Sequence, residues 1–388
     1  MEIVLVNTWR VVNAKGGTEK VFCDMANALD AMGHNVKAVC LDVEKGVPGF
    51  PISDKVQFIN AKGCEEPIYC RGLLKKIRAF CLNRDERRRR RKEIEYDWDA
   101  QLLRKVIEKI EHVDICVSFQ PETTYLLSRL RCLTAPIITM FHCQPQYLFL
   151  KKKGNMREIE VAVRSSRLIT VLLPRYINEI KNLYPDASVM AIPNVIPSFE
   201  KASLLNSKTI VCVGRLDKDK RVDLLIKAFA IVAHKIPEWN VEFWGETDVD
   251  PVYREKIFQL VENLNLQKRF SFCGTTNDVE NVLESASIFA FPSAFEGFSL
   301  ALGEAMAKGL PVIGCKDCVG TSEMIEDERN GLLVEPTPNE FANALISLAE
   351  NQCLRRELGV KAREYARGYS PEFIWQMWDD LICKIVQS

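Results

Sequence analysis

Short apolar runs alternate along the chain with stretches in which apolar residues recur every three or four positions. Residues 3–6 form one such run, an amphipathic stretch extends to Met32, and residues 36–40 form the next run. The runs are typical of buried strands, and the stretch between them is typical of a helix, for which Thr18 is a candidate N-cap. The pattern predicts a β-α-β unit of a parallel sheet.

The same alternation restarts after the proline-containing stretch 193–207. It predicts strands at 209–213, 241–244, 270–273, 288–291, 311–313 and 331–334, and helices at 222–234, 252–264, 278–286, 299–308 and 339–350. The simplest architecture that accounts for this alternation is two doubly wound, Rossmann-like α/β domains that face each other across a cleft. We expect residues 1–197 to form the first domain, 198–370 the second, and 371–388 a terminal helix that packs back on the first.

Composition excludes several classes of protein. The 388 residues are 47% hydrophobic and 27% charged, and the 52 basic side chains balance 52 acidic ones. These values indicate a globular protein whose net charge does not attract nucleic acid. No apolar run reaches the length of a membrane span, and the first residues do not resemble a signal peptide, so we expect a cytoplasmic protein with reduced cysteines.

Two loops that follow predicted strands carry residues suited to binding an anion. Gly16 and Gly17 lie between the first strand and the first helix, where backbone N–H groups can approach a phosphate, although a plain turn is the alternative. Arg215 and Lys220 follow the strand 209–213, where they form either a clamp for a diphosphate or a solvated turn. The G-x-G-x-x-G of nicotinamide and flavin enzymes is absent from the sequence.

The most informative segment follows the predicted strand 288–291. A helix is predicted to begin near Ser299, so that the backbone N–H groups of Phe298, Ser299 and Leu300 lie at a positive helix end where phosphate can bind. Glu296 lies just before this helix and Glu304 lies within it. Carboxylates accept hydrogen bonds from sugar hydroxyls, so this pair is suited to hold the two sugars on either side of a diphosphate.

This segment resembles the hallmark of the retaining glycosyltransferases of family 4, which have the GT-B fold and include bacterial polysaccharide hexosyltransferases. The hallmark is two glutamates separated by seven residues, here Glu296 and Glu304. Other elements similar to the family are Gly16-Gly17, Gly214 to Lys220, Gly297-Phe298, Ala305-Met306-Ala307, Gly309, Pro311-Val312-Ile313, Glu323 and Asn330-Gly331. The departures are Ser299 and Arg221 in place of glycine, Ala301 in place of proline, and Gly303 in place of an aliphatic residue.

The resemblance implies a role for each site residue. Arg215 and Lys220 would bind the donor diphosphate, Gly16 and Gly17 would lie beside the donor, Glu304 would bind the ribose hydroxyls, Glu296 the transferred sugar, and Gly297, Phe298, Ser299 and Leu300 would contact phosphates and sugar through their backbone. His142, after the predicted strand 136–139, matches the first-domain histidine beside the donor sugar. The side chain of Ser299 is expected to disturb the donor geometry at that point.

The resemblance also implies a reaction. A hexose or N-acetylhexosamine would pass from a nucleotide diphosphate sugar, preferably UDP-linked but with GDP-mannose as a second option, to a glycan or lipid-linked acceptor in lipopolysaccharide or other cell-surface polysaccharide synthesis. The leaving diphosphate would itself accept the acceptor's proton, so neither a metal nor a cofactor is required. An epimerase or phosphorylase of the same fold, or a non-catalytic nucleotide-binding module, is the alternative.

Three D-x-D triplets, at 97–99, 217–219 and 248–250, spell the metal motif of a different glycosyltransferase fold. About one such triplet is expected by chance in a chain of this composition, so the triplets carry little weight.

A basic segment interrupts the first domain as an insertion over 71–99. Residues 71–92 carry 11 basic and 2 acidic side chains, and apolar and basic faces coexist along 71–82. We favour a helix that lies on the anionic inner surface of the cell membrane, as a lipid-linked acceptor would require. A solvated insertion and a nucleic-acid site are the other interpretations, and we expect no nucleic-acid partner.

Overall fold

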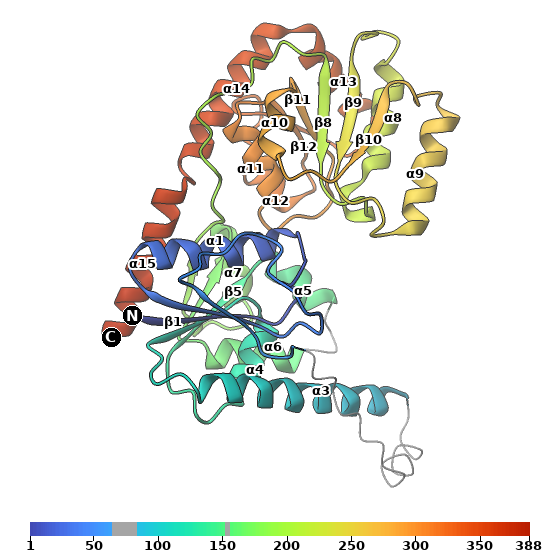
Figure 1. Ribbon diagram of the computed structural model, residues 1–388. Helices are drawn as coiled ribbons and strands as arrows, with labels where there is room; N and C mark the ends of the chain where they lie inside the picture. The colour runs from blue at the N-terminus through green and yellow to red at the C-terminus, as the bar shows by residue number, and fades with distance from the viewer. Residues whose placement is uncertain (64–83, 152–155) are drawn as a thin grey trace. The chain divides into compact units, whose positions relative to one another are not determined.

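The computed structural model describes residues 1–63, 84–151 and 156–388. They form two compact units: Met1–Ile192 with Trp375–Ser388, and Pro193–Ile374 (Figure 1). We call these unit 1 and unit 2. Their boundaries fall at 192/193 and 374/375, whereas the predicted boundaries fall at 197/198 and 370/371.

Unit 1 contains a parallel sheet of seven strands among its described residues, in the order β3-β2-β1-β4-β5-β6-β7. The strands are β1 (Glu2–Asn7), β2 (Asn35–Cys40), β3 (Gln57–Asn60), β4 (Ile115–Ser118), β5 (Ile137–Phe141), β6 (Leu168–Val171) and β7 (Val189–Ala191). The helices are α1 (Gly17–Ala31), α3 (Arg84–Ile107), α4 (Pro121–Leu127), α5 (Pro145–Lys151), α6 (Met156–Ser165), α7 (Pro174–Lys181) and the last part of α15 (Pro371–Gln387). The central strand β1 reads as a continuous apolar run because residues on both faces of it are buried.

Unit 2 contains a parallel sheet of six strands, in the order β10-β9-β8-β11-β12-β13. The strands are β8 (Thr209–Val213), β9 (Asn240–Trp244), β10 (Phe270–Gly274), β11 (Ile288–Phe291), β12 (Val312–Cys315) and β13 (Leu332–Val334). The helices are η1 (Lys218–Lys220), α8 (Val222–Val232), α9 (Pro251–Asn263), α10 (Val279–Glu284), α11 (Leu300–Ala307), α12 (Val319–Ser322), α13 (Pro338–Glu350) and α14 (Gln352–Arg367). Its core packs Phe229 of α8 and Phe341 of α13, both fully buried, with Phe243 of β9. Burial of each such side chain stabilises the fold by about 1.5–3 kcal/mol.

The predicted architecture of two doubly wound α/β domains is confirmed. Every strand and helix predicted in the second domain is present, with ends that agree to within two residues. The prediction that Thr18 caps the first helix is wrong, because α1 begins one residue earlier, at Gly17. Gly16 is the N-cap, with extended backbone angles, and no side chain accepts a hydrogen bond from the first turn.

The order of the strands locates the sites at which such sheets bind ligands. In unit 1 the winding reverses between β1 and β4, and in unit 2 it reverses between β8 and β11. All the strand pairs are parallel, so the loops after neighbouring strands lie along one edge of each sheet. A ligand of a doubly wound sheet binds at that edge, beside the reversal.

The basic segment is described only from residue 84 onward, where α3 begins; residues 71–83 lie outside the described part of the chain. Within the described residues, none of the helices combines the length and the apolar character needed to cross a membrane.

Candidate functional site

The loops after β8 and β11 meet at the reversal point of unit 2. The loop after β8 runs from Gly214 through the short helix η1, and the loop after β11 runs from Pro292 to Ser299. The backbone N–H of Ala294 donates to the carbonyl of Asp219 at 2.7 Å, which fastens one loop to the other. Most of the residues that the sequence predicts for diphosphate and sugar binding are on these two loops.

Close backbone contacts fix the start of the first loop. Gly245 has φ +145°, and a Cβ at that position would lie 1.8 Å from the carbonyl oxygen of Gly214, so only glycine fits. The Lys220 side chain runs over Gly214, whose ideal Cβ position is 3.3 Å from Lys220 Cε. Asp217 accepts hydrogen bonds from the backbone N–H groups of Asp219 and Lys220 and thereby caps η1.

Lys220 and Glu296 form an ion pair between the two loops. Their side chains are only 18% and 12% exposed, and the Lys220 ammonium also lies 5.3 Å from the centre of the Phe291 ring. The structure thus brings together a cation and a carboxylate that are 76 positions apart in the sequence. Both residues were predicted to contact the donor, one at its diphosphate and the other at its sugar.

Arg215 lies on the same loop in a different environment. Its side chain is 64% exposed, and its guanidinium nitrogen Nη2 is 3.6 Å from Asp217 Oδ2. A guanidinium group this exposed retains its hydration and its freedom to move toward a phosphate.

The N-terminus of α11 lies immediately after Glu296. Ser299 is its N-cap, and its hydroxyl oxygen accepts a hydrogen bond from the backbone N–H of Leu302 at 3.3 Å. The Ser299 hydroxyl is thus turned toward the helix that it caps, and the expected effect of this side chain on donor geometry stays a prediction. Gly297 and Leu300, on either side, are half-buried.

Two further residues complete this segment. Phe298 is 5% exposed, and its ring lies 5.5 Å from that of Tyr369. Glu304 lies in the second turn of α11 and is half-buried. The two glutamates of the predicted motif therefore occupy different kinds of position, one in a loop and one on a helix.

Arg221 contributes a contact that the sequence did not predict. Its guanidinium group binds both carboxylate oxygens of Asp317, at 2.8 and 3.0 Å, and donates to the carbonyl of Ser293 at 3.0 Å. This joins the loop after β12 to the other two loops. The nearby Asp317 carboxylate raises the pKa of the Arg221 guanidinium against the opposing effect of its burial.

Gly320 is a second residue that sequence reasoning missed. An ideal Cβ at this position would lie 2.5 Å from the carbonyl oxygen of Glu296, so the start of α12 packs directly on the backbone of that residue. The sequence analysis noted Glu323, three residues after Gly320, as similar to the family. It did not show that this part of the chain contacts Glu296.

The predicted residues of unit 1 lie at the carboxyl edge of its own sheet. Gly16 and Gly17 follow β1 and open α1. His142 follows β5, and its ring stacks on Phe119 at 5.3 Å with an angle of 19° between the planes. Its Nε2 is buried and has no hydrogen-bond partner among the described residues. Burial lowers the pKa of His142 to about 4, so the ring is neutral near pH 7.

Five of the six carboxylates in the three D-x-D triplets are engaged in other contacts. Asp97 and Asp99 pair with Arg129 and Lys62, Asp217 and Asp250 cap helices, and Asp248 pairs with Arg254. Across the described residues, no three His, Cys, Asp or Glu side chains are arranged to hold a metal ion. Cys315 and Cys318 are buried free thiols, and burial raises the pKa of each.

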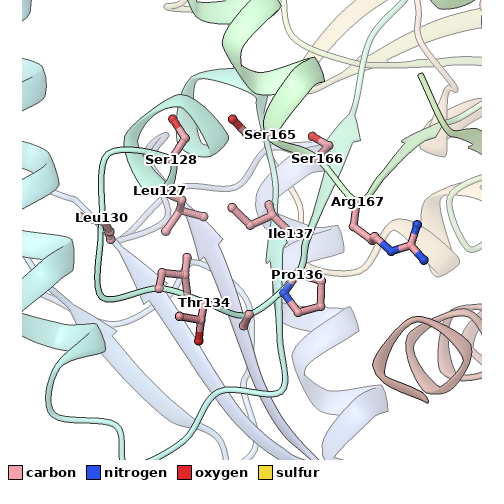
Figure 2. A pocket seen from close by; sticks show the side chains of 11 residues that line it. Leu127, Ser128, Leu130, Thr134, Pro136, Ile137, Ser165, Ser166 and Arg167 are labelled. Carbon is pink, nitrogen blue, oxygen red and sulfur yellow. The ribbon is translucent and has the colours of Figure 1, made fainter. Parts of the chain in front are cut away.

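A hollow of about 470 Å³ in unit 1 lies elsewhere on the molecule (Figure 2). Its lining includes Pro136, Ile137 and Arg167, at the amino ends of β5 and β6 and thus at the opposite edge of the sheet from His142. Two of its hydroxyls bind carbonyls of neighbouring helices: Ser128 donates to Tyr125 at 2.9 Å and Ser166 donates to Ala162 at 2.6 Å. This hollow contains none of the predicted site residues.

Comparison with known proteins places this site in a family context. Residues 197–366 match the family model described as Glycosyl transferases group 1. The chain is 26% identical over 378 residues to an uncharacterized glycosyltransferase of Haemophilus influenzae, covering 96% of this chain and 97% of that protein. It is 27% identical over 277 residues to the UDP-Gal:alpha-D-GlcNAc-diphosphoundecaprenol alpha-1,3-galactosyltransferase of Escherichia coli, covering 65% of this chain and 70% of that protein.

Solved structures of the same fold resemble the whole chain. Sucrose-phosphate synthase from Thermosynechococcus elongatus matches with a TM-score of 0.80 at 19% identity, covering 99% of this chain and 98% of that one. S. aureus TarM, in complex with fondaparinux, alpha-GlcNAc-glycerol and UDP, matches with a TM-score of 0.76 at 17% identity, covering 98% and 99%. Residues 197–366 thus form a Glycosyl transferases group 1 domain within a GT-B fold, and the chain has glycosyltransferases among its relatives.

Proposed function

We propose that this chain is a retaining, family 4 type hexosyltransferase that moves a hexose or N-acetylhexosamine from a nucleotide diphosphate sugar to a glycan or lipid-linked acceptor. The observation that carries the proposal is the pairing of Lys220 with Glu296 beside the N-terminus of α11. A cation and a helix N-terminus attract phosphate, and a carboxylate accepts hydrogen bonds from sugar hydroxyls. A nucleotide diphosphate sugar presents both chemistries in one molecule.

The names of the similar proteins support the choice of donor and acceptor. The Escherichia coli relative is named for UDP-Gal and a diphosphoundecaprenol substrate, and the TarM structure contains UDP. We therefore favour a UDP-linked donor over GDP-mannose, and an acceptor used in lipopolysaccharide or other cell-surface polysaccharide synthesis.

Each predicted residue has a part in the proposal. Arg215 and Lys220 bind the diphosphate, Glu304 binds the ribose, Glu296 binds the transferred sugar, and the backbone of residues 297–300 contacts phosphate and sugar. In the first domain, Gly16 and Gly17 lie beside the donor, and His142 binds a sugar hydroxyl. A histidine with a pKa of about 4 is neutral at pH 7 and can hydrogen bond to a hydroxyl without carrying charge.

The proposed step proceeds with retention and without a protein base. The acceptor oxygen forms a bond to the sugar's anomeric carbon on the face from which the diphosphate departs. The electrons of the broken carbon–oxygen bond go to the diphosphate, and the acceptor's proton passes to one of its oxygens. Lys220, Arg215 and the α11 N-terminus stabilise the developing negative charge. No cofactor or metal is part of the proposal.

A thermal-shift panel of UDP, GDP, ADP and their common sugar conjugates tests this proposal. A ligand at 100 times its dissociation constant adds about 2.7 kcal/mol to the free energy of unfolding. We expect one base to be selected, and Lys220→Ala and Glu304→Ala to lose the shift and the transfer activity while remaining folded. Lys227→Ala is the matched control, since Lys227 pairs with Asp223 on an exposed part of α8.

Two outcomes would contradict the proposal. Wild-type turnover in folded Lys220→Ala or Glu304→Ala would exclude the assigned site. Consumption or isomerisation of the donor at the same rate with and without an acceptor would favour the epimerase alternative.

We also propose that the enzyme works at the anionic inner face of the cell membrane. Arg89, Arg90 and Arg91 on α3 are exposed, as a lipid-binding surface requires. At low salt, the protein should sediment with liposomes that contain anionic lipid and not with zwitterionic ones. Sedimentation with neither would exclude this location.

A further inference from the structure

In the proposed donor site, the positive charge of Lys220 is paired with the negative charge of Glu296. Both side chains are largely buried, so each depends on the other for much of the stabilisation that water would otherwise supply. Lys220 is also confined by Phe291 and Gly214, on which its stem and ammonium lie. A phosphate that enters the site must therefore compete with the Glu296 carboxylate for the same ammonium group.

The consequence for Glu296 depends on what else the ligand carries. When Lys220 turns to a phosphate, Glu296 keeps its negative charge and its low exposure but loses this cation. A free nucleoside diphosphate brings only more negative charge to Glu296, because its ribose hydroxyls are assigned to Glu304. A nucleotide sugar also brings hydroxyl groups, which donate hydrogen bonds to a carboxylate and replace the lost ammonium.

We propose that the Lys220–Glu296 ion pair makes the site selective for sugar-bearing nucleotides over the free nucleoside diphosphate, which is the product of transfer. This inference rests on the proposed function and specifies how that site discriminates. Until a sugar hydroxyl reaches Glu296, its carboxylate competes with the phosphate for the ammonium group of Lys220. After transfer the sugar has left, the carboxylate regains Lys220, and the diphosphate is released.

The backbone around Glu296 keeps the carboxylate in place during this exchange. The start of α12 packs on its carbonyl oxygen at Gly320, and the preceding residues are fastened through Ala294 and Ser293 to the loop after β8. A residue held in this way does not follow its departing partner. The carboxylate that Lys220 leaves behind thus belongs to a fixed loop, and it opposes a diphosphate that brings no sugar hydroxyl to it.

Isothermal titration of the full chain with UDP and with the UDP-sugar that gives the largest shift in the panel tests this inference. In the wild type we expect the UDP-sugar to bind at least about tenfold more tightly than UDP, a difference of about 1.4 kcal/mol. Glu296→Gln removes the competing charge while keeping the side chain's size. It should tighten the binding of UDP by about threefold to tenfold and bring the ratio of the two dissociation constants close to one.

Glu284→Gln is the matched control. Glu284 pairs with the buried Lys308 at 2.8 Å in the same unit, so the substitution removes the same charge from another lysine–glutamate pair. The ratio of dissociation constants should equal that of the wild type. A measurement on the wild type alone supplements the variants: the free monosaccharide should tighten the binding of UDP, relative to mannitol at the same concentration.

The outcomes separate this inference from the function on which it rests. If UDP binds and needs Lys220, but Glu296→Gln binds it no more tightly than the wild type does, the selectivity mechanism is wrong and the proposed function stands. An unaltered preference for the UDP-sugar in Glu296→Gln would have the same meaning. If no nucleotide binds the wild type, both proposals fail.

Discussion

The guanidinium group of Arg221 binds both carboxylate oxygens of Asp317, although the two residues are 96 positions apart in the sequence. Arg221 has φ 46° and ψ 43°, a left-handed conformation that glycine adopts readily and other residues avoid. This backbone conformation is one that suits the glycine of the family pattern that this segment resembles. The contacts with Asp317 and Ser293 offset the strain here and fix the loop after β12.

We expect the two simplest replacements of Arg221 to differ in stability. Both Arg221→Ala and Arg221→Gly lose the ion pair, but only alanine retains the unfavourable backbone conformation. The free energy of unfolding should therefore be about 1 kcal/mol lower for Arg221→Ala than for Arg221→Gly. Urea denaturation of the full chain measures this difference, and equal stabilities would show that the left-handed conformation carries no strain.

Gly320→Ala should impair transfer more than it impairs folding. The added methyl group would lie 2.5 Å from the carbonyl oxygen of Glu296, so that backbone must shift. A displacement of about 1 Å at a residue that positions substrate lowers kcat/KM by about a hundredfold. Gly368→Ala is the control, because its methyl group would meet nothing closer than 3.4 Å. Wild-type kcat/KM in Gly320→Ala would contradict the assigned role of Glu296.

Gly303 and Ile196 should show strong coupling in a double-mutant cycle. A Cβ at Gly303 would lie 2.7 Å from Ile196 Cγ1, which is buried. In the wild type, Gly303→Ala should lower the free energy of unfolding by about 1–3 kcal/mol through overpacking. In the Ile196→Ala background the same change should raise it by about 1 kcal/mol, because alanine is the better helix former and space is available.

That sign reversal is the critical observation, and thermal or urea unfolding of the four proteins is sufficient to detect it. Additive effects would mean that Ile196 does not determine which side chain fits at position 303.

His142 should make the chain sensitive to acid. Its pKa is about 4 in the folded chain, below the 6.5 of an unperturbed histidine, so the unfolded chain takes up a proton first as the pH falls. The free energy of unfolding should be insensitive to this residue above pH 6.5 and should fall by roughly 3 kcal/mol between about pH 6.5 and about pH 4.

His142→Gln should lose this part of the pH dependence. Urea denaturation of the wild type and the variant at pH 7.5, 6 and 5 measures it, and His112→Gln, at a position where the side chain is 74% exposed, is the control. Parallel pH profiles for the wild type and His142→Gln would show that the histidine is not held neutral in the folded chain.

The sequence predicted the elements of unit 2 well because the signals for strands and helices are local. Apolar spacing within 288–291 or 222–234 reports which residues face the core, and the structure has both elements. Caps are harder to predict, since Thr18 and Gly16 are both acceptable N-caps and the choice depends on how the whole loop packs.

The site residues named from the sequence stay a prediction, and the sequence did not predict which residues they contact. Lys220 and Glu296 were each linked to the donor, yet nothing in the sequence indicated that they pair with each other. The side chain of Ser299 was noted only as a departure near the start of a predicted helix, and Arg221 only as a departure from a pattern. Their roles, as a helix cap and as a link to Asp317, depend on backbone angles and on contacts between distant residues, which periodicity does not encode.

The chain leaves unit 1 after Ile192 and returns to it at Trp375. The returning segment completes the core of unit 1, since Trp378 and Ile382 are buried and Asp379 lies 2.7 Å from His34 Nε2. During translation, every residue of unit 2 is therefore synthesised before residues 375–388, which belong to unit 1. Unit 2 can thus finish folding on the ribosome before residues 375–388 have joined unit 1, and a chain cut short within this segment has a complete unit 2 but an incomplete unit 1.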